Sequence, residues 1–197
     1  VAEFDLATQR FKTLLQGNVD AIYFNEKLYI GKREEVFVYN ESTGNFDLFY
    51  HLAGKNITLS CLHLDKNKNL WLGTTSNGIY CLSEDKNLSR PVTKGNITSI
   101  YEDSSNELWI GSWEEGLYRV KTDGSIENLR HNPMNTNSLC SNFVRSCCED
   151  NSGDLWIGTF NGLNRYDRET GKFHLYTANG NSPDGLTHSS IWCIVKD

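Results

Sequence analysis

The stretch DLWIGTFNGLNRYDRETGKFHLY, residues 154–176, predicts three consecutive β-strands joined by tight turns. Leu155 to Thr159 has the aromatic and β-branched content of a strand, and the Asn161-Gly162 pair tolerates the left-handed backbone of a hairpin turn. Leu163 to Tyr166 is the returning strand. Asp167 to Gly171 is a second turn, with Asp at its start and Gly where a positive φ is expected, and it leads into a third strand at Lys172 to Tyr176. The stretch therefore predicts a small antiparallel sheet.

The same unit recurs along the chain as a tandem array. Its copies are Leu108 to Ser112 with Gly116 to Tyr118, Leu70 to Thr74 with Asn77 to Tyr80, and a weaker copy at Leu28 to Gly31 with Val36 to Tyr39. The marker glycines stand at positions 31, 73, 111 and 158, so their spacings are 42, 38 and 47 residues. A period of about 40 to 45 residues with four short strands per period is typical of propeller blades.

Each repeat also has an inner strand that precedes the Leu-Trp motif. The inner strands are expected to begin near Val19, Ile57, Ile97 and Phe143, and the last three end at an acidic residue, Asp65, Asp103 or Asp150. The blades are expected at 19–50, 57–90, 97–130 and 143–176, with residues 1–15 as the end of a preceding blade and 189–197 as the inner strand of a following one. The chain is therefore predicted to be all-β, with β-propeller blades of four antiparallel strands that form a fragment of a larger, seven-bladed propeller; the alternative is closure of the two incomplete ends on each other.

The composition favours an ordinary globular protein and excludes several classes. The chain has 197 residues, 38% of them hydrophobic, and a net charge of −6, which argues against a basic nucleic-acid binder. It has no apolar run near the roughly 20 residues that a membrane-spanning helix needs. Nothing at the first residues resembles a signal peptide, so any export signal has been removed or lies outside the chain.

The cysteines and histidines give no metal or catalytic pattern. Six cysteines, at positions 61, 81, 140, 147, 148 and 193, form no C-x-x-C pair and do not cluster with histidine, so neither zinc nor another cofactor is predicted. We expect free buried thiols, with Cys140 the most reactive because it lies in a long connector. The histidines at 51, 63, 131, 174 and 188 are scattered and indicate no triad, so no catalytic residue is assigned.

The segments that differ between repeats are the candidates for ligand contact, because binding residues are concentrated on loops of a fixed scaffold. The predicted top turns carry Trp113 and Phe160, and the longest connector runs from Arg130 to Asn142. Aromatic rings beside Arg and Asn side chains suit carbohydrate, since the apolar face of a sugar stacks on a ring while its hydroxyl groups need directional partners. Trp113, Phe160, Arg130 and Asn142 are therefore the predicted ligand-binding residues. The repeated Trp and Gly residues are expected to be structural.

The repeat at Ile97 to Arg119, I-x-S-I-Y-E-D-S-x-x-x-L-W-I-G-S-x-x-x-G-L-Y-R, and its variant at Asn142 to Arg165 resemble the two-component regulator propeller repeat. The resemblance implies the periplasmic sensor region of a hybrid two-component system of gut Bacteroidetes, anchored in the inner membrane by a span outside this chain. It also implies a histidine kinase, a receiver and a DNA-binding domain elsewhere in the full-length protein, which controls polysaccharide-utilisation genes. The expected partners are a glycan and a second copy of the intact ectodomain, and this segment itself is expected to be neither an enzyme nor in contact with nucleic acid.

Two other classes remain as alternatives. A propeller lyase that resembles streptogramin lyase also repeats a G-x-(L/I)-W strand, and it would need histidine and acidic residues converging on one face with a metal. A propeller that serves only as a protein-interaction scaffold, similar to WD-repeat proteins, would carry Gly-His and Trp-Asp signatures, which this chain lacks.

Overall fold

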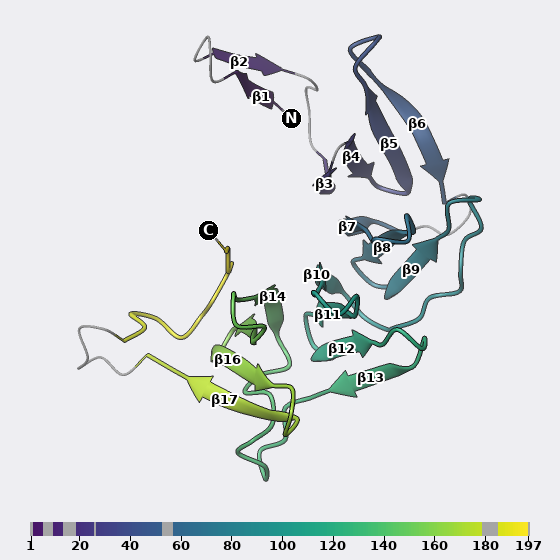
Figure 1. Ribbon diagram of the computed structural model, residues 1–197. Coiled ribbons are helices and arrows are strands. Elements are labelled where there is room, and N and C mark those ends of the chain that lie inside the picture. Colours follow the sequence, from purple (N-terminus) through teal and green to yellow (C-terminus); the bar gives the residue numbers. More distant parts are fainter. Residues whose placement is uncertain are drawn as a thin grey trace.

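The computed structural model describes residues 2–5, 10–13, 19–25, 27–52, 57–178 and 185–196, and every regular element in these ranges is a strand. Four antiparallel sheets follow one another along an arc, and the first strand of each lies toward the middle (Figure 1). The predicted all-β architecture of propeller blades is therefore confirmed. Among the described residues, no helix is long and apolar enough to cross a membrane.

The strands of each sheet are hydrogen-bonded in sequence order, as expected for propeller blades. The first sheet contains β3 (Ala21–Asn25), β4 (Lys27–Lys32), β5 (Glu35–Asn40) and β6 (Asn45–His51). The second contains β7 (Leu59–Leu64), β8 (Leu70–Thr74) and β9 (Ile79–Leu82). The third contains β10 (Ile97–Glu102), β11 (Leu108–Ser112), β12 (Leu117–Val120) and β13 (Ile126–Leu129), and the fourth contains β14 (Val144–Glu149), β15 (Leu155–Thr159), β16 (Gly162–Asp167) and β17 (Lys172–Tyr176).

The second sheet departs from the predicted four strands because its last segment pairs only in part. Leu88 forms an isolated bridge with Leu82, and the amides of Ser89 and Val92 donate to carbonyls of β9. Between them stands Pro91, which has no amide hydrogen and cannot continue a ladder. The outer edge of this sheet is therefore held by single hydrogen bonds.

The two ends of the chain flank the arc. At the N-terminal end, β1 (Ala2–Asp5) and β2 (Arg10–Thr13) form a two-stranded antiparallel sheet within the segment predicted to end a preceding blade. The inner strand predicted at 189–197 is not formed over the described residues 185–196, although the Ile191 amide donates to the Thr159 carbonyl at 2.9 Å. To form a ladder, this segment would need a neighbouring strand on the side that faces away from β15, and no described strand lies there. Residue 197 lies outside the described residues.

A repeated Asp–Trp contact fixes the bottom turn of three sheets. Asp103 closes a turn in which Asn106 has a φ of 62°, and one carboxylate oxygen accepts the backbone amides of Ser105 and Glu107, both at 2.9 Å. The other oxygen accepts the indole N–H of Trp109 at 2.7 Å. The same i to i+6 bond joins Asp65 to Trp71 and Asp150 to Trp156, each at 2.8 Å. Sequence reasoning identified both the acid and the Trp but missed the bond between them, although their constant spacing was visible.

The marker glycines are required by close approach across each inner hairpin. A Cβ on Gly111 would lie 2.5 Å from Ser99 Oγ and 2.9 Å from Val144 Cγ1 of the next sheet. Gly73 is equally confined, because its Cβ would lie 2.4 Å from the sulfur of Cys61. The predicted structural role of these glycines therefore has a steric cause.

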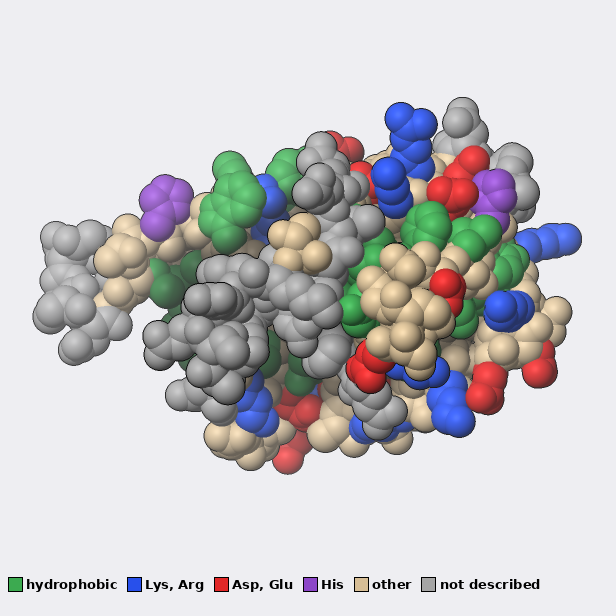
Figure 2. Space-filling model, turned by 90° about the horizontal axis from the view of Figure 1, so that it is seen from above, with side chains coloured by type: hydrophobic (Ala, Val, Ile, Leu, Met, Phe, Trp, Pro, Cys, Tyr) green, Lys and Arg blue, Asp and Glu red, His purple; other side chains and the backbone are tan. Residues whose placement is uncertain are grey.

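The hydrophobic core lies mainly between neighbouring sheets. Trp109 is fully buried and packs with Val144, Ile157 and Tyr166 of the following sheet, and Trp71 packs in the same way against Ile97. The expectation that the repeated Trp rings fill the space between blades is therefore confirmed for these two. On the side of the molecule shown in Figure 2, basic and acidic side chains are interspersed.

Candidate functional site

The predicted top turns hold their first residue in one fixed position. The side-chain oxygens of Ser112 and Thr159 each donate to the carbonyl at the far end of their turn, at 2.8 and 2.9 Å, and both residues are fully buried. One residue later, the amide of Trp113 donates to the Asn96 carbonyl at 2.9 Å, just before β10. The amide of Phe160 donates in the same way to the Phe143 carbonyl at 3.0 Å, just before β14. Trp113 and Phe160 are therefore equivalent residues in neighbouring sheets.

The structure brings these two predicted rings together through a third ring that sequence reasoning missed. Phe143 precedes β14, with its ring centre 5.5 Å from that of Trp113 in an edge-to-face arrangement and 6.2 Å from that of Phe160. Phe160 is 50% exposed, whereas Trp113 is partly buried. Edge-to-face packing is a favourable geometry for aromatic pairs. We call these three residues, together with Trp192, the aromatic patch.

Arg145 joins Trp192 to the patch. Its guanidinium carbon lies 4.3 Å from the ring centre of Trp113 and 3.8 Å from that of Trp192, which is 67% exposed. Its Nε is buried and has no hydrogen-bond partner among the described residues. Arg145 thus places a positive charge between two indole rings, a stabilising cation–π arrangement.

Arg145 occupies a position that is structural in the preceding sheets. β7, β10 and β14 each have a register irregularity at their second residue, which is Ser60, Thr98 or Arg145. The hydroxyl groups of Ser60 and Thr98 each donate at 2.6 Å to a carbonyl of the next inner strand. A β-bulge re-aims the side chain at its extra residue. In the fourth sheet this position holds a guanidinium that makes no such bond.

The other two predicted residues, Arg130 and Asn142, hold the connector onto the same turn. Arg130 forms an ion pair with Glu115 and donates to the carbonyl of Glu114 at 3.3 Å. The Asn142 side chain accepts the amide of His131 at 2.8 Å, and its carbonyl accepts the amide of Gly116 at 3.1 Å. The connector therefore does emerge beside the top turn, as expected, but both side chains are already engaged in contacts within the chain.

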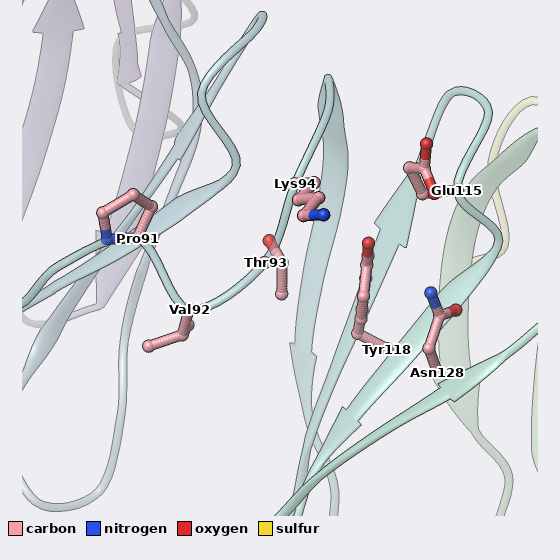
Figure 3. A pocket seen from close by; sticks show the side chains of 7 residues that line it. All are labelled: Pro91, Val92, Thr93, Lys94, Glu115, Tyr118 and Asn128. Carbon is pink, nitrogen blue, oxygen red and sulfur yellow. The ribbon is translucent and has the colours of Figure 1, made fainter.

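A pocket of about 490 Å³ lies on the other side of this turn, at the outer part of the second and third sheets. It is lined by Pro91, Val92, Thr93, Lys94, Glu115, Tyr118 and Asn128. Figure 3 shows Tyr118 and Asn128 extending from β12 and β13 toward the end of the sheet where Glu115 stands, opposite Lys94. Burial raises the pKa of the Tyr118 hydroxyl, so this group is a neutral hydrogen-bond donor at physiological pH. The lining suits polar groups of a ligand, whereas the patch offers aromatic faces.

The histidines lie in separate parts of the fold. His51 is 3.4 Å from Glu34 on the first sheet, and the Nδ1 of His131 is 2.8 Å from the Leu139 carbonyl in the connector. His63 lies between the inner strands, 3.6 Å from Glu102. No group of three or more His, Cys, Asp or Glu residues that could hold a metal is present within the described ranges.

All six cysteines are free thiols. Burial raises the pKa of Cys61 to about 12 and that of Cys81 to about 11, and it raises the pKa of Cys147 as well. The sequence predicted Cys140 as the most reactive thiol, but its sulfur lies 3.1 Å from Thr159 Oγ1 and accepts a hydrogen bond from Asn164 at 2.9 Å. The exposed thiol is Cys193. Contacts between the connector and β16 account for the difference.

The model of the two component regulator propeller family matches residues 51–76, 91–114 and 138–161 of the chain. These ranges contain the inner hairpins of the second, third and fourth sheets. The weak first repeat, which lacks Trp, is not among them. No curated protein is significantly similar to the chain.

Solved structures of similar fold share little sequence with the chain. A Staphylococcus aureus virginiamycin B lyase, in an inactive H270A form with quinupristin, has a TM-score of 0.64 and 17% identity, with 83% of this chain and 56% of that chain covered. An extracellular domain assigned to the hybrid two component system BT3049 of B. thetaiotaomicron has a TM-score of 0.58 and 21% identity, with coverages of 100% and 32%. PorZ, a surface component of the type-IX secretion system of Porphyromonas gingivalis, has a TM-score of 0.67 and 16% identity, with coverages of 91% and 30%. The chain thus spans about half or less of each of these proteins.

Proposed function

Because three of its repeats belong to the two-component regulator propeller family, we propose that this chain is a non-catalytic part of the ligand-sensing ectodomain of a hybrid two-component system. The match of the family model is the observation that carries the proposal. In this assignment the ectodomain is periplasmic, a span outside this chain anchors it in the inner membrane, and the kinase lies elsewhere in the full-length protein. A homodimer of the ectodomain transmits the signal to genes for polysaccharide use.

The proposed ligand is a glycan, bound at the aromatic patch. Phe160 offers an exposed ring, and Phe143 joins it to Trp113 across the boundary between the third and fourth sheets. A sugar ring stacks on such a surface through its apolar face, and its hydroxyl groups require polar partners close by. Arg130 and Asn142, which the sequence suggested as these partners, hold the turn and the connector in place and support the site indirectly.

The test combines a glycan array on the intact ectodomain with signalling by the full-length receptor. Phe160→Ala is expected to weaken binding by about 1 to 3 kcal/mol and to leave the melting temperature nearly unchanged, since half of the ring is already exposed. Leu48→Ala, which removes a 55% exposed side chain on β6, is the matched control and should leave binding unchanged. A Phe160→Ala receptor that binds and signals like the unaltered one would place the ligand outside the patch.

The propeller lyase remains the second candidate, because its fold is similar over 83% of the chain. That similarity, at 17% identity, concerns the fold alone. The lyase hypothesis predicts histidine and acidic residues converging on one face, whereas His51, His63 and His131 are each held in a different part of the structure. An assay of streptogramin inactivation by the purified protein distinguishes the two: turnover would favour the lyase.

A further inference from the structure

We infer that Arg145 recognises the carboxylate of an acidic sugar, so that the glycan bound at the aromatic patch carries a uronic acid. The inference rests on the proposed sensor function and narrows its ligand class. Arg145 differs in its contacts from the equivalent residues of the two preceding sheets, Ser60 and Thr98.

The bulge position of the inner strand ordinarily joins adjacent sheets. Ser60 and Thr98 do so by donating to the carbonyls of Ile97 and Val144. Arg145 makes no hydrogen bond or ion pair with a described residue through its side chain, and its buried Nε lacks a partner. An unpaired buried donor on a charged group is costly unless a partner of opposite charge is supplied. Among the described residues, this position of the fourth sheet therefore makes no bond to a following strand, and it holds a positive charge.

The aromatic rings restrict how a partner can approach Arg145. The guanidinium carbon lies over both the Trp113 ring and the Trp192 ring. A guanidinium is planar, so a hydrogen-bonding partner reaches its N–H groups at an edge and not through a face that a ring covers. A carboxylate fits this geometry because it is planar and accepts two parallel N–H bonds from one guanidinium edge. A sugar ring that bears the carboxylate would then extend over the neighbouring rings Phe143 and Phe160.

The charges nearby favour an anion at this place. In the adjacent turn, the carboxylate of Glu115 is paired with Arg130. No carboxylate is paired with Arg145 in the parts of the chain that the structure describes. A ligand carboxylate is the partner that we infer for this charge, although the protein as a whole is acidic.

The experiment uses the full-length protein and trisaccharides from polygalacturonate, alginate and heparosan. Each trisaccharide is compared with its carboxyl-reduced neutral form, and a sulfated neutral trisaccharide serves as a further probe. At least one uronic acid probe should bind, and carboxyl reduction should weaken that binding by about 10- to 100-fold, the range expected for a hydrogen-bonded charge pair. Arg145→Met should cause a similar loss for the acidic probe and less than about a twofold change for the reduced form. Arg145→Lys should fall between, since an ammonium cannot make the planar bidentate contact.

Arg165→Met is the matched control, because this arginine has a carboxylate partner in the same sheet, Asp154 at 3.4 Å, and its loss should leave affinity unchanged. The inference is overturned if no uronic acid probe binds, if only sulfated or neutral probes bind, or if Arg145→Met lowers the melting temperature without a selective loss of acidic ligand. Binding and signalling by a neutral glycan would overturn the acidic ligand and still support the sensor function. Absence of signalling with every glycan would count against both.

Discussion

The fully buried Asp103–Trp109 contact should be the most stabilising of the three repeated Asp–Trp bonds. Trp109→Phe keeps an aromatic ring but removes the indole N–H that donates to Asp103 at 2.7 Å, where neither side chain reaches solvent. A hydrogen bond to a charged group contributes about 1.5 to 3 kcal/mol, and the smaller ring leaves a space, so the expected loss is about 2 to 4 kcal/mol. Trp109→Ala should cost about 3 to 5 kcal/mol.

Trp156→Phe provides the matched control. It removes the same bond at 2.8 Å from a partly exposed ring, where water can replace the donor, so the loss should be smaller. Urea unfolding followed by circular dichroism at pH 7 gives both free energies of unfolding. An equal or greater loss for Trp156→Phe would refute the claim that burial gives the bond its value.

The pH dependence of the same variant offers an independent check. Burial tends to raise the pKa of Asp103, but the bonds from Trp109, from the amide of Glu107 and from Arg168 outweigh it and hold the pKa below its ordinary value. A depressed carboxylate pKa contributes stability that is present above the pKa of the unfolded state and is lost as the pH falls through the folded pKa. Trp109→Phe raises the folded pKa of Asp103 toward the unfolded one, so the acid-dependent loss should begin at the same pH, end at a higher pH and be smaller in total. An unchanged acid limb would contradict this.

Three further predictions concern packing, charge and thiol access. Gly111→Ala should destabilise the protein by about 1 to 3 kcal/mol, because the new Cβ would lie 2.5 Å from Ser99 Oγ. Adding Ser99→Gly to the same chain should recover part of this loss, measured by urea unfolding. No recovery would reject the steric cause. Burial lowers the pKa of His63, although the nearby carboxylates of Glu102 and Asp65 act in the opposite direction. The unfolded chain therefore binds the proton at higher pH than the folded chain, and the stability should decrease as the pH falls below about 6.5. His63→Gln should give a flatter profile of stability between pH 7 and 5. A stability that rises on acidification over this range would show that Glu102 dominates. Iodoacetamide should label Cys193 of the folded chain first and Cys61 and Cys147 last, because the latter thiols are buried and their pKa values are raised; mass spectrometry of the digested protein would reveal any other order.

Local sequence determined the repeated sheets. The strand residues of Leu155 to Thr159, the polar turns and the recurrent glycines each act within one hairpin, so their pattern predicts a blade without knowledge of its neighbours. The prediction was wrong where the local rule depended on a partner strand: the second sheet lacks a continuous fourth strand beside Pro91, and residues 185–196 remain without a ladder. Pairing requires two strands, whereas the pattern of one strand can be read alone.

The candidate site was only partly visible in the sequence. Trp113 and Phe160 were identified because large rings stand out in turns that otherwise contain polar residues. Arg145 was missed because it occupies a strand position where other repeats have Ser60 and Thr98, and nothing local marks it as a separate feature. Its signal was the replacement of a small hydroxyl residue by a long cation at one repeat position.

Only the tertiary structure decided what surrounds Arg145. Trp113 belongs to the preceding sheet and Trp192 to the segment that follows the fourth sheet, so the two rings meet one guanidinium only when the sheets stand side by side around the arc. The sequence by itself therefore determined most of the strands, the turns and the two aromatic residues of the top turns, because these depend on residues close together in the chain. The packing of whole sheets sets the distances between Trp113, Arg145 and Trp192, which come from three parts of the chain. The position of the charge beside the two rings therefore depends on the tertiary structure.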